Sequence, residues 1–157
     1  DAKVVGTKVF KNSEIKEFKN LEIKGPRPGL RVVARNTTQL RGPTEFHGWY
    51  LIENNGEATG VYDVTIYANE SIVYIYDVST YTMIGIATPG SPFKTDVVLD
   101  PWDYPAKIYR IKAEAYLGSK PKHYGSTIFV RETSYNQLNK NASLIGWAFC
   151  TTNWCPE

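Results

Sequence analysis

Apolar and polar residues alternate along most of this chain with the two-residue period of a half-buried β-strand. Segment 107–116 alternates most regularly, with Arg110, Lys112 and Glu114 on its polar side and Tyr109, Ile111, Ala113 and Ala115 on its apolar side. The same pattern places Leu30, Val32 and Ala34 of segment 30–35, and Tyr62, Val64 and Ile66 of segment 61–67, on the core side. The predicted strands are 3–10, 30–35, 48–53, 61–67, 72–78, 81–87, 93–99, 107–116, 126–133 and 144–149.

Turn residues separate these segments about every ten residues, as in all-β sandwiches and barrels. Gly25–Gly29 and Pro89–Pro92 are firm turns. Segment 118–125 is expected to be a loop, and 134–143 a polar connection with room for one helical turn. We therefore predict an all-β antiparallel sandwich at 13–157 and a separate N-terminal extension at 1–12.

The composition fits one secreted globular domain. Hydrophobic residues make up 42% of the 157 residues and charged residues 22%, as is usual in folded chains. No apolar run approaches the ~18 residues of a membrane span, so no span is expected. The first residue is Asp rather than Met, from which we expect a removed secretory leader and an extracellular, cell-surface location.

Charge is distributed unevenly between the two ends of the chain. Segment 1–41 has ten Lys and Arg against four Asp and Glu, a net charge of +6, and segment 42–157 has eight against twelve, a net charge of −4. One reading is that the cations protect a sheet edge from unwanted pairing. The other is that the basic segment of one copy meets the acidic body of the next.

The only two cysteines, Cys150 and Cys155, lie close together in the sequence CTTNWC. A disulfide between them would close a small loop and contribute about 2 kcal/mol, and it would imply an oxidising compartment or a hyperthermophile. Two buried free thiols are the alternative. Zinc would need two further ligands, and His47 and His123 lie far away in sequence.

Three N-x-S/T sequons begin at Asn36, Asn69 and Asn141. In a secreted chain, sequons at strand ends and turns predict N-linked glycans that point outward. The alternative is that they only reflect the polar composition of turns.

The segment 48–116 contains a turn, Asn54-Asn55-Gly56-Glu57-Ala58, followed by a strand that includes Tyr62-Asp63-Val64 and ends in a short polar hairpin, Ala68-Asn69-Glu70-Ser71. It resembles the core of the Ig-like domains of prokaryotic surface proteins, over less than half of the chain. The resemblance implies an Ig-like antiparallel β-sandwich with an extended N-terminal strand. Because these motifs mainly specify turns between strands, they imply a fold rather than a function.

In layout, the chain is also similar to the thread and bundling pilins of archaeal extracellular filaments, whose subunits donate an N-terminal strand to a neighbour. The similarity implies a filament of identical subunits. The candidate donor strand is KVVGTKVF, with Val4, Val5, Val9 and Phe10 as its apolar side chains. Pairing of this strand within its own subunit and a disordered tail are the alternatives.

A secreted carbohydrate-binding or adhesive module is the second hypothesis for function. Trp102 and Tyr104 are its candidate stacking residues, because the flanking Pro101 and Pro105 favour an exposed loop. Trp49 and Trp147 are expected in the core instead. A viral coat subunit is a third hypothesis, since it would share almost all of these features.

No catalytic motif accompanies the histidines, and we expect neither an enzyme nor a cofactor. Asp96, Asp100 and Asp103 have carboxylates suited to calcium, but their spacing fits no standard loop, so no metal site is expected. Nucleic-acid binding is not expected either, because the basic segment lacks interleaved exposed aromatic residues.

Overall fold

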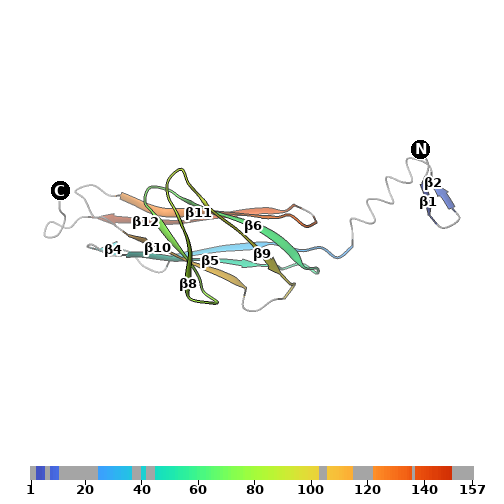
Figure 1. Ribbon diagram of the computed structural model, residues 1–157, viewed down its shortest axis with the longest axis horizontal. Helices are drawn as coiled ribbons and strands as arrows, with labels where there is room; N and C mark the ends of the chain where they lie inside the picture. Colours follow the sequence, from blue (N-terminus) through green and yellow to red (C-terminus); the bar gives the residue numbers. More distant parts are fainter. Residues whose placement is uncertain are drawn as a thin grey trace.

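The computed structural model of the chain describes residues 3–5, 8–10, 25–36, 40–41, 45–102, 106–114, 122–135 and 137–149. Within these ranges the chain forms twelve β-strands and no helix, so the prediction of an all-β fold is confirmed. Ten of the strands form two five-stranded sheets, which stack as the two layers of a sandwich (Figure 1).

The first sheet has the strand order β3-β5-β10-β7-β8 and is antiparallel throughout. Its strands are β3 (Arg31–Asn36), β5 (Glu45–Glu53), β10 (Lys107–Glu114), β7 (Val73–Asp77) and β8 (Thr82–Ala87). The second sheet has the order β4-β12-β11-β6-β9, and only its β4–β12 pair is parallel. Its strands are β4 (Leu40–Arg41), β12 (Asn139–Phe149), β11 (Lys122–Glu132), β6 (Gly60–Ala68) and β9 (Phe93–Leu99).

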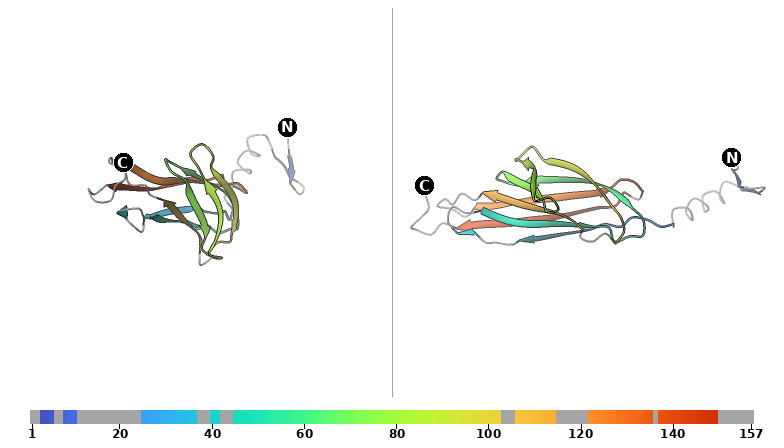
Figure 2. Two further views of the ribbon diagram at one scale, coloured as in Figure 1. Left: turned by 60° about the vertical axis from the view of Figure 1, so that its left-hand side comes forward. Right: turned by 60° about the horizontal axis from the view of Figure 1, so that its bottom comes forward.

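Seven of these strands follow the order of an immunoglobulin-like sandwich, in which strands A, B, E and D face strands G, F and C. β3, β5, β10 and β7 correspond to the first set, and β12, β11 and β6 to the second. β8 and β9 are added at one side of the sandwich, where Thr88 and Ser91 hydrogen-bond to each other through their backbones (Figure 2). The predicted Ig-like antiparallel β-sandwich is therefore confirmed.

The core lies between the sheets, on the faces that the alternation predicted. Its buried residues include Leu30, Tyr62, Val64, Ile66, Tyr109, Ile111 and Ala113. Val32 and Ala34 pack against them from β3. Burying an apolar side chain of this size contributes about 1.5–3 kcal/mol, so this shared core is the main source of stability.

Two strands begin earlier than predicted. β11 begins at Lys122, inside the segment expected to be a loop, and β12 begins at Asn139, inside the segment expected to be a polar connection. The prediction of a helical turn is therefore wrong for residues 139–143, which belong to β12. The pattern failed here because Asn139, Lys140 and Asn141 are all exposed, so this part of β12 shows no apolar alternation.

Asn54 holds three connections together at one end of the sandwich. Its side-chain oxygen accepts hydrogen bonds from the N–H groups of Gly29 (2.9 Å) and Gly56 (3.0 Å). Its amide nitrogen donates to the carbonyl oxygens of Ala58 (2.8 Å) and Leu99 (2.9 Å). The backbones meet so closely that a Cβ on Gly56 would lie 2.2 Å from the nitrogen of Gly29. The Asn-x-Gly-x-Ala motif therefore forms a turn in which the Asn54 side chain hydrogen-bonds the backbones of Gly56 and Ala58.

Glu132 is a fully buried carboxylate. It lies at the end of β11 and accepts hydrogen bonds from the N–H groups of Ser134 (2.7 Å), Tyr135 (3.1 Å) and Gln137 (3.2 Å), and from the Ser134 hydroxyl. A buried charge is tolerated only with such partners. Glu132 thus fixes the turn from β11 into β12.

Segment 3–10, which was expected to be one extended strand, contains two short strands. β1 (Lys3–Val5) and β2 (Lys8–Phe10) form an antiparallel pair in which Val4 lies opposite Val9. Among the described residues they share no ladder with either five-stranded sheet.

Candidate functional site

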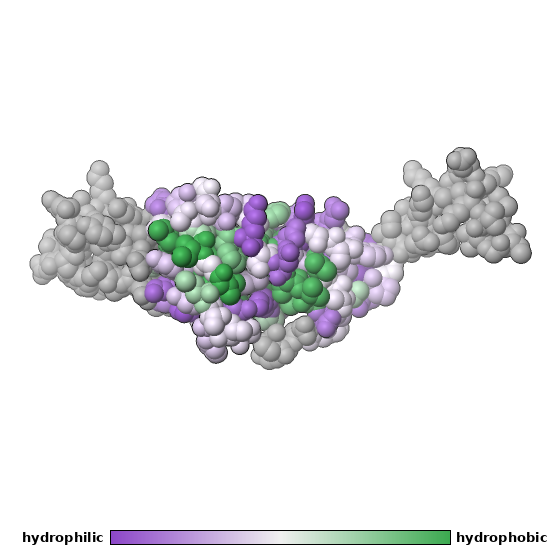
Figure 3. Space-filling model, viewed as in Figure 1, coloured by the Kyte–Doolittle hydropathy of each residue, from purple (hydrophilic) through white to green (hydrophobic). Residues whose placement is uncertain are grey.

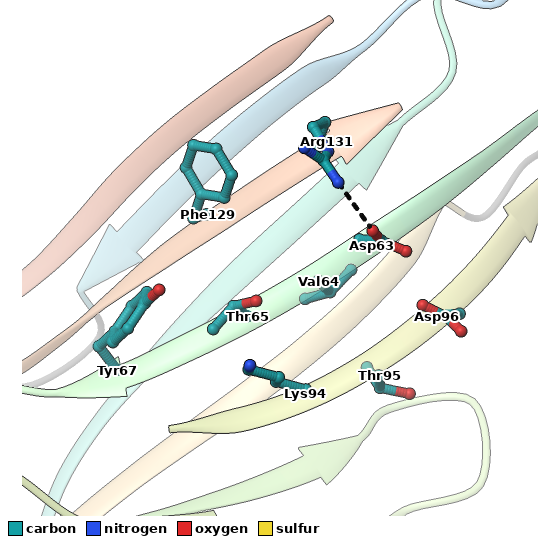
Figure 4. A pocket seen from close by; sticks show the side chains of 9 residues that line it. All are labelled: Asp63, Val64, Thr65, Tyr67, Lys94, Thr95, Asp96, Phe129 and Arg131. Atoms are coloured by element: carbon teal, nitrogen blue, oxygen red, sulfur yellow. Dashed lines mark ion pairs between the residues drawn. The ribbon is translucent and has the colours of Figure 1, made fainter. Parts of the chain in front are cut away.

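A hollow of about 450 Å³ opens on the outer face of the second sheet, which is turned away from the core (Figure 4). Because successive residues of a strand point to opposite faces, burial of Tyr62, Val64 and Ile66 directs Asp63, Thr65 and Tyr67 outward. Three neighbouring strands line the hollow, with Asp63, Val64, Thr65 and Tyr67 from β6, Lys94, Thr95 and Asp96 from β9, and Phe129 and Arg131 from β11.

Two carboxylates lie side by side in this hollow, because Asp63 on β6 is the direct register partner of Asp96 on the neighbouring strand β9. A hydrogen bond with Asp63 is the largest cause that raises the pKa of Asp96, and partial desolvation and the Asp63 charge act in the same direction. Arg131 lies on the other side, with its Nη2 3.6 Å from Asp63 Oδ2. Like charges directly opposite each other destabilise a sheet, so stability alone does not favour this pair.

Two aromatic rings lie beside these charges. Tyr67 on β6 is 45% exposed and Phe129 on β11 is 36% exposed. Figure 4 shows both rings along the same face as the carboxylates and Arg131. Apolar rings beside hydrogen-bonding groups of both kinds suit a ligand that has an apolar face and a polar rim.

The hollow brings two carboxylates together, those of Asp63 and Asp96. Among the described residues, no group of three or more His, Cys, Asp or Glu side chains gathers to hold an ion. Of the three predicted carboxylates, Asp96 faces Asp63, Asp100 Oδ1 accepts a hydrogen bond of 2.6 Å from the Thr59 hydroxyl, and Asp103 lies outside the described residues.

The outer edge of β12 is a second feature that a partner can contact. β12 is eleven residues long and pairs with β11 along Asn139–Ala148, whereas β4 pairs with it only at Ala148 and Phe149. Asn36 of β3 donates its side-chain N–H to the carbonyl of Ile145 (3.1 Å). Within the described chain, no strand pairs with the outer side of Asn139–Trp147. An edge of this kind is a template for another strand.

The predicted donor residues lie in the β1–β2 pair, with Val4 and Val5 on β1 and Val9 and Phe10 on β2. Their side chains lie outside what the structure describes. Donation of this segment therefore stays a prediction.

The structure places the three predicted glycosylation residues in different settings, all exposed. Asn36 ends β3 and uses its side-chain nitrogen to bond Ile145. Asn69 follows β6 in the connection to β7. Asn141 lies within β12, on the same face as Phe129, its register partner on β11.

The predicted stacking residue Trp102 is 80% exposed and has a left-handed backbone with φ of 67°. Tyr104 lies outside the described residues, as do Cys150, Cys155 and Trp154, so the disulfide stays a prediction. Trp49, which was expected in the core, lies on the outer face of the first sheet opposite Arg35 and Arg110, because its neighbour Tyr50 points inward.

His47 and its neighbours form a cationic and aromatic row on that same outer face. Its Nδ1 lies 3.2 Å from Arg110 Nη1, and the Arg110 guanidinium stacks 4.2 Å from the centre of the Tyr76 ring. On the face seen in Figure 3, apolar surface forms separate patches with polar side chains between them.

Sequence reasoning missed the constellation around Asp63. The alternation in 61–67 assigns Asp63 to the outward side, but its facing residue depends on which strand pairs with β6. That strand is β9, which follows only after the β7–β8 hairpin has joined the other sheet. The exposed Phe129 at the centre of a predicted strand was the one available signal.

None of the described residues forms a helix that is long and apolar enough to cross a membrane. No protein-family model matches the chain, and no curated protein matches it. Its structure is similar to that of the sporulation control protein Spo0M from Bacillus subtilis, with a TM-score of 0.47 and 7% identity over 78% of this chain. The chain spans 50% of the length of that Spo0M chain.

Two further solved structures are similar over nearly their whole length. The N-terminal domain of PorA has a TM-score of 0.46 and 8% identity, covering 76% of this chain and 97% of that one. ACE19, the collagen-binding subdomain of the Enterococcus faecalis surface protein ACE, has a TM-score of 0.36 and 6% identity, covering 78% and 97%. At these TM-scores the likenesses carry no argument about function, and the fold assignment rests on the strand order itself.

Proposed function

We propose that this chain is the subunit of an extracellular cell-surface filament, in which each copy donates its N-terminal segment to the next. The observation that carries the proposal is the outer edge of β12 along Asn139–Trp147, with which no described strand pairs. β3 lies beside this edge and contacts it through the Asn36 side chain, so a donated strand would have to displace that contact. A donated strand would pair with this edge and extend the second sheet. The proposal assigns the chain no catalytic reaction.

The donor segment and the edge match in length. Lys3–Phe10 has eight residues and Asn139–Trp147 has nine. At about 3.4 Å per residue, both span roughly 30 Å when extended. In one copy, β1 and β2 pair through only three residue pairs, and so small a hairpin is marginal by itself. Donation would exchange these three pairs for a longer ladder.

The charge distribution favours contact between different copies. Lys3 and Lys8 give the donor segment 3–10 a net charge of +2, which attracts it to acidic side chains of another copy. The other basic residues of the described part of 1–41 belong to the body itself, at Arg27, Arg31, Arg35 and Arg41. Such a contact joins two different surfaces, head to tail. It therefore builds an open filament of identical subunits rather than a closed dimer.

Deletion of 1–11 tests the proposal. We expect the full chain to form filaments under negative-stain microscopy and the truncated chain to remain monomeric. A synthetic peptide of residues 1–11 added to the truncated chain should raise its unfolding temperature, because it restores the missing strand. The same peptide with Val4→Asp and Val9→Asp is the matched control and should have no effect.

Filaments of normal length from the truncated chain would refute donation. The alternative function is a secreted carbohydrate-binding or adhesive module, which the exposure of Trp102 favours. In that case the full chain would be monomeric under the microscope and retained on a glycan resin.

A further inference from the structure

Asn141 is the one predicted glycosylation residue that lies beside the hollow of the second sheet. It is exposed near the start of β12, and Ser143, which completes its sequon, is exposed on the same face. Its direct register partner is Phe129, which is 36% exposed at the rim of the hollow. A sugar on the Asn141 amide would thus begin next to an exposed aromatic ring.

The register continues from this ring into the hollow. Asn141 lies opposite Phe129, Phe129 opposite Thr65, and Thr65 opposite Lys94, so the four residues form one row across β12, β11, β6 and β9. Three strand spacings separate the ends of the row, about 14 Å. A chain of sugars that follows this row from Asn141 would run along the floor of the hollow.

The lining of the hollow has the chemistry that a saccharide needs. A pyranose ring has an apolar C–H face, which packs on an aromatic ring, and a rim of hydroxyl groups that donate and accept hydrogen bonds. Phe129 and Tyr67 supply the rings. Asp63 and Asp96 supply acceptors, while Lys94 and Arg131 supply donors. The two acidic and two basic groups leave this lining without net charge.

We infer that Asn141 carries a glycan and that the hollow on the outer face of the second sheet binds it, with the first sugar packed on Phe129. Sugar hydroxyls beyond it replace water on the opposed carboxylates of Asp63 and Asp96. This inference rests on the extracellular location in the proposed function, but not on filament formation. A glycan that extends toward β9 in this way runs away from the outer edge of β12.

The other two sequons lack this setting. Asn36 already uses its side-chain nitrogen to bond Ile145, and its sequon threonine lies outside the described residues. Asn69 lies in a connection between strands and does not line the hollow. Asn69 is therefore the matched control for Asn141.

The test compares the full chain secreted from a eukaryotic host that glycosylates N-x-S/T with the same chain from a bacterial host that does not. Intact-mass measurement should show a glycan at Asn141. Asn141→Gln should lower the unfolding midpoint of the glycosylated chain by about 2–4 °C. The same substitution should have little effect on the bacterial chain, and Asn69→Gln should have little effect on either.

A double-mutant cycle then separates stacking from a general effect of glycosylation. Phe129→Thr keeps a residue that favours strands but removes the ring. If the glycan rests on Phe129, the effect of Asn141→Gln should vanish in the Phe129→Thr background. Additive effects, or an unmodified Asn141 in the secreted chain, would overturn the inference. Filament formation by the Asn141→Gln chain decides the proposed function separately.

Discussion

Polar side chains inside the sandwich differ in kind from those on the outer face of its second sheet. Asn54 and Glu132 are buried, and their side-chain oxygens and the Asn54 amide each meet backbone partners. On the outer face, Asp63 and Asp96 oppose each other with like charges, beside two exposed rings. Burial requires the first arrangement, because an unpaired polar group in the interior is costly.

Nothing comparable requires the second arrangement. Water can solvate any polar side chain on the outer face, so the sheet would be at least as stable with a neutral residue in place of one aspartate. A local arrangement that costs stability is expected mainly where a function uses it. The contrast therefore separates residues that the fold requires from residues whose arrangement the fold does not require.

The largest expected effect tests the interior side of this contrast. Asn54→Ala removes four hydrogen bonds and leaves N–H and carbonyl groups of three connections without their partner. We expect the free energy of unfolding to fall by about 3 kcal/mol, measured by urea denaturation. The exposed neighbour Asn55→Ala is the control and should change it by less than ~0.5 kcal/mol. Equal losses for the two variants would contradict the role of Asn54.

Sequence alone predicts the core of this molecule better than its outer faces. Tyr62 and Ile111 were assigned correctly because burial imposes a strict two-residue period. The first residues of β12 have polar side chains on both faces, so their strand was not predicted. The pairing of Asp63 with Asp96 depends on the order of strands across the sheet, which no local pattern encodes.

The Ig-like resemblance correctly predicted the type of sandwich. Its Asn54 turn motif corresponds to the place where the Asn54 side chain links separate loops by hydrogen bonds. The resemblance did not indicate which residues line the hollow, and two of them come from outside the matched segment. Phe129 and Arg131 lie on a strand outside the segment 48–116 that carried the resemblance. A turn motif reports local backbone geometry, whereas a site on a sheet face depends on side chains from three strands.

A smaller effect is expected for the buried phenols at alkaline pH. Burial raises the pKa of Tyr50 from 10.0 to about 12, although hydrogen bonds with Ser126 and Leu144 lower it in part. Burial also raises the pKa values of Tyr62 and Tyr109. Between pH 10 and about 12 the unfolded chain releases the Tyr50 proton and the folded chain keeps it. Stability that is fully present below pH 10 is therefore lost as the pH rises.

Above pH 10, each such tyrosine should make the free energy of unfolding fall more steeply, by about 1.4 kcal/mol per pH unit. Urea denaturation between pH 9 and pH 11.5 measures the slope. Tyr50→Phe should be less stable at pH 7, because it loses the hydroxyl that bonds Ser126 (2.7 Å), but its stability should fall less steeply above pH 10. Equal slopes for the two proteins would show that Tyr50 does not hold its proton through this range.

The smallest expected effect has the opposite sign and tests the outer face. In the unglycosylated chain, Asp96→Asn removes the repulsion from Asp63 and adds an amide that donates to its carboxylate. We expect the unfolding midpoint at pH 7 to rise by roughly 1–2 °C. The raised pKa of Asp96 means that acid relieves the same repulsion in the original chain, so the difference should shrink as the pH falls. Glu70→Gln, an exposed substitution after β6, is the matched control. A lower midpoint for Asp96→Asn would show that the two carboxylates stabilise the sheet, and the contrast between interior and outer face would then fail.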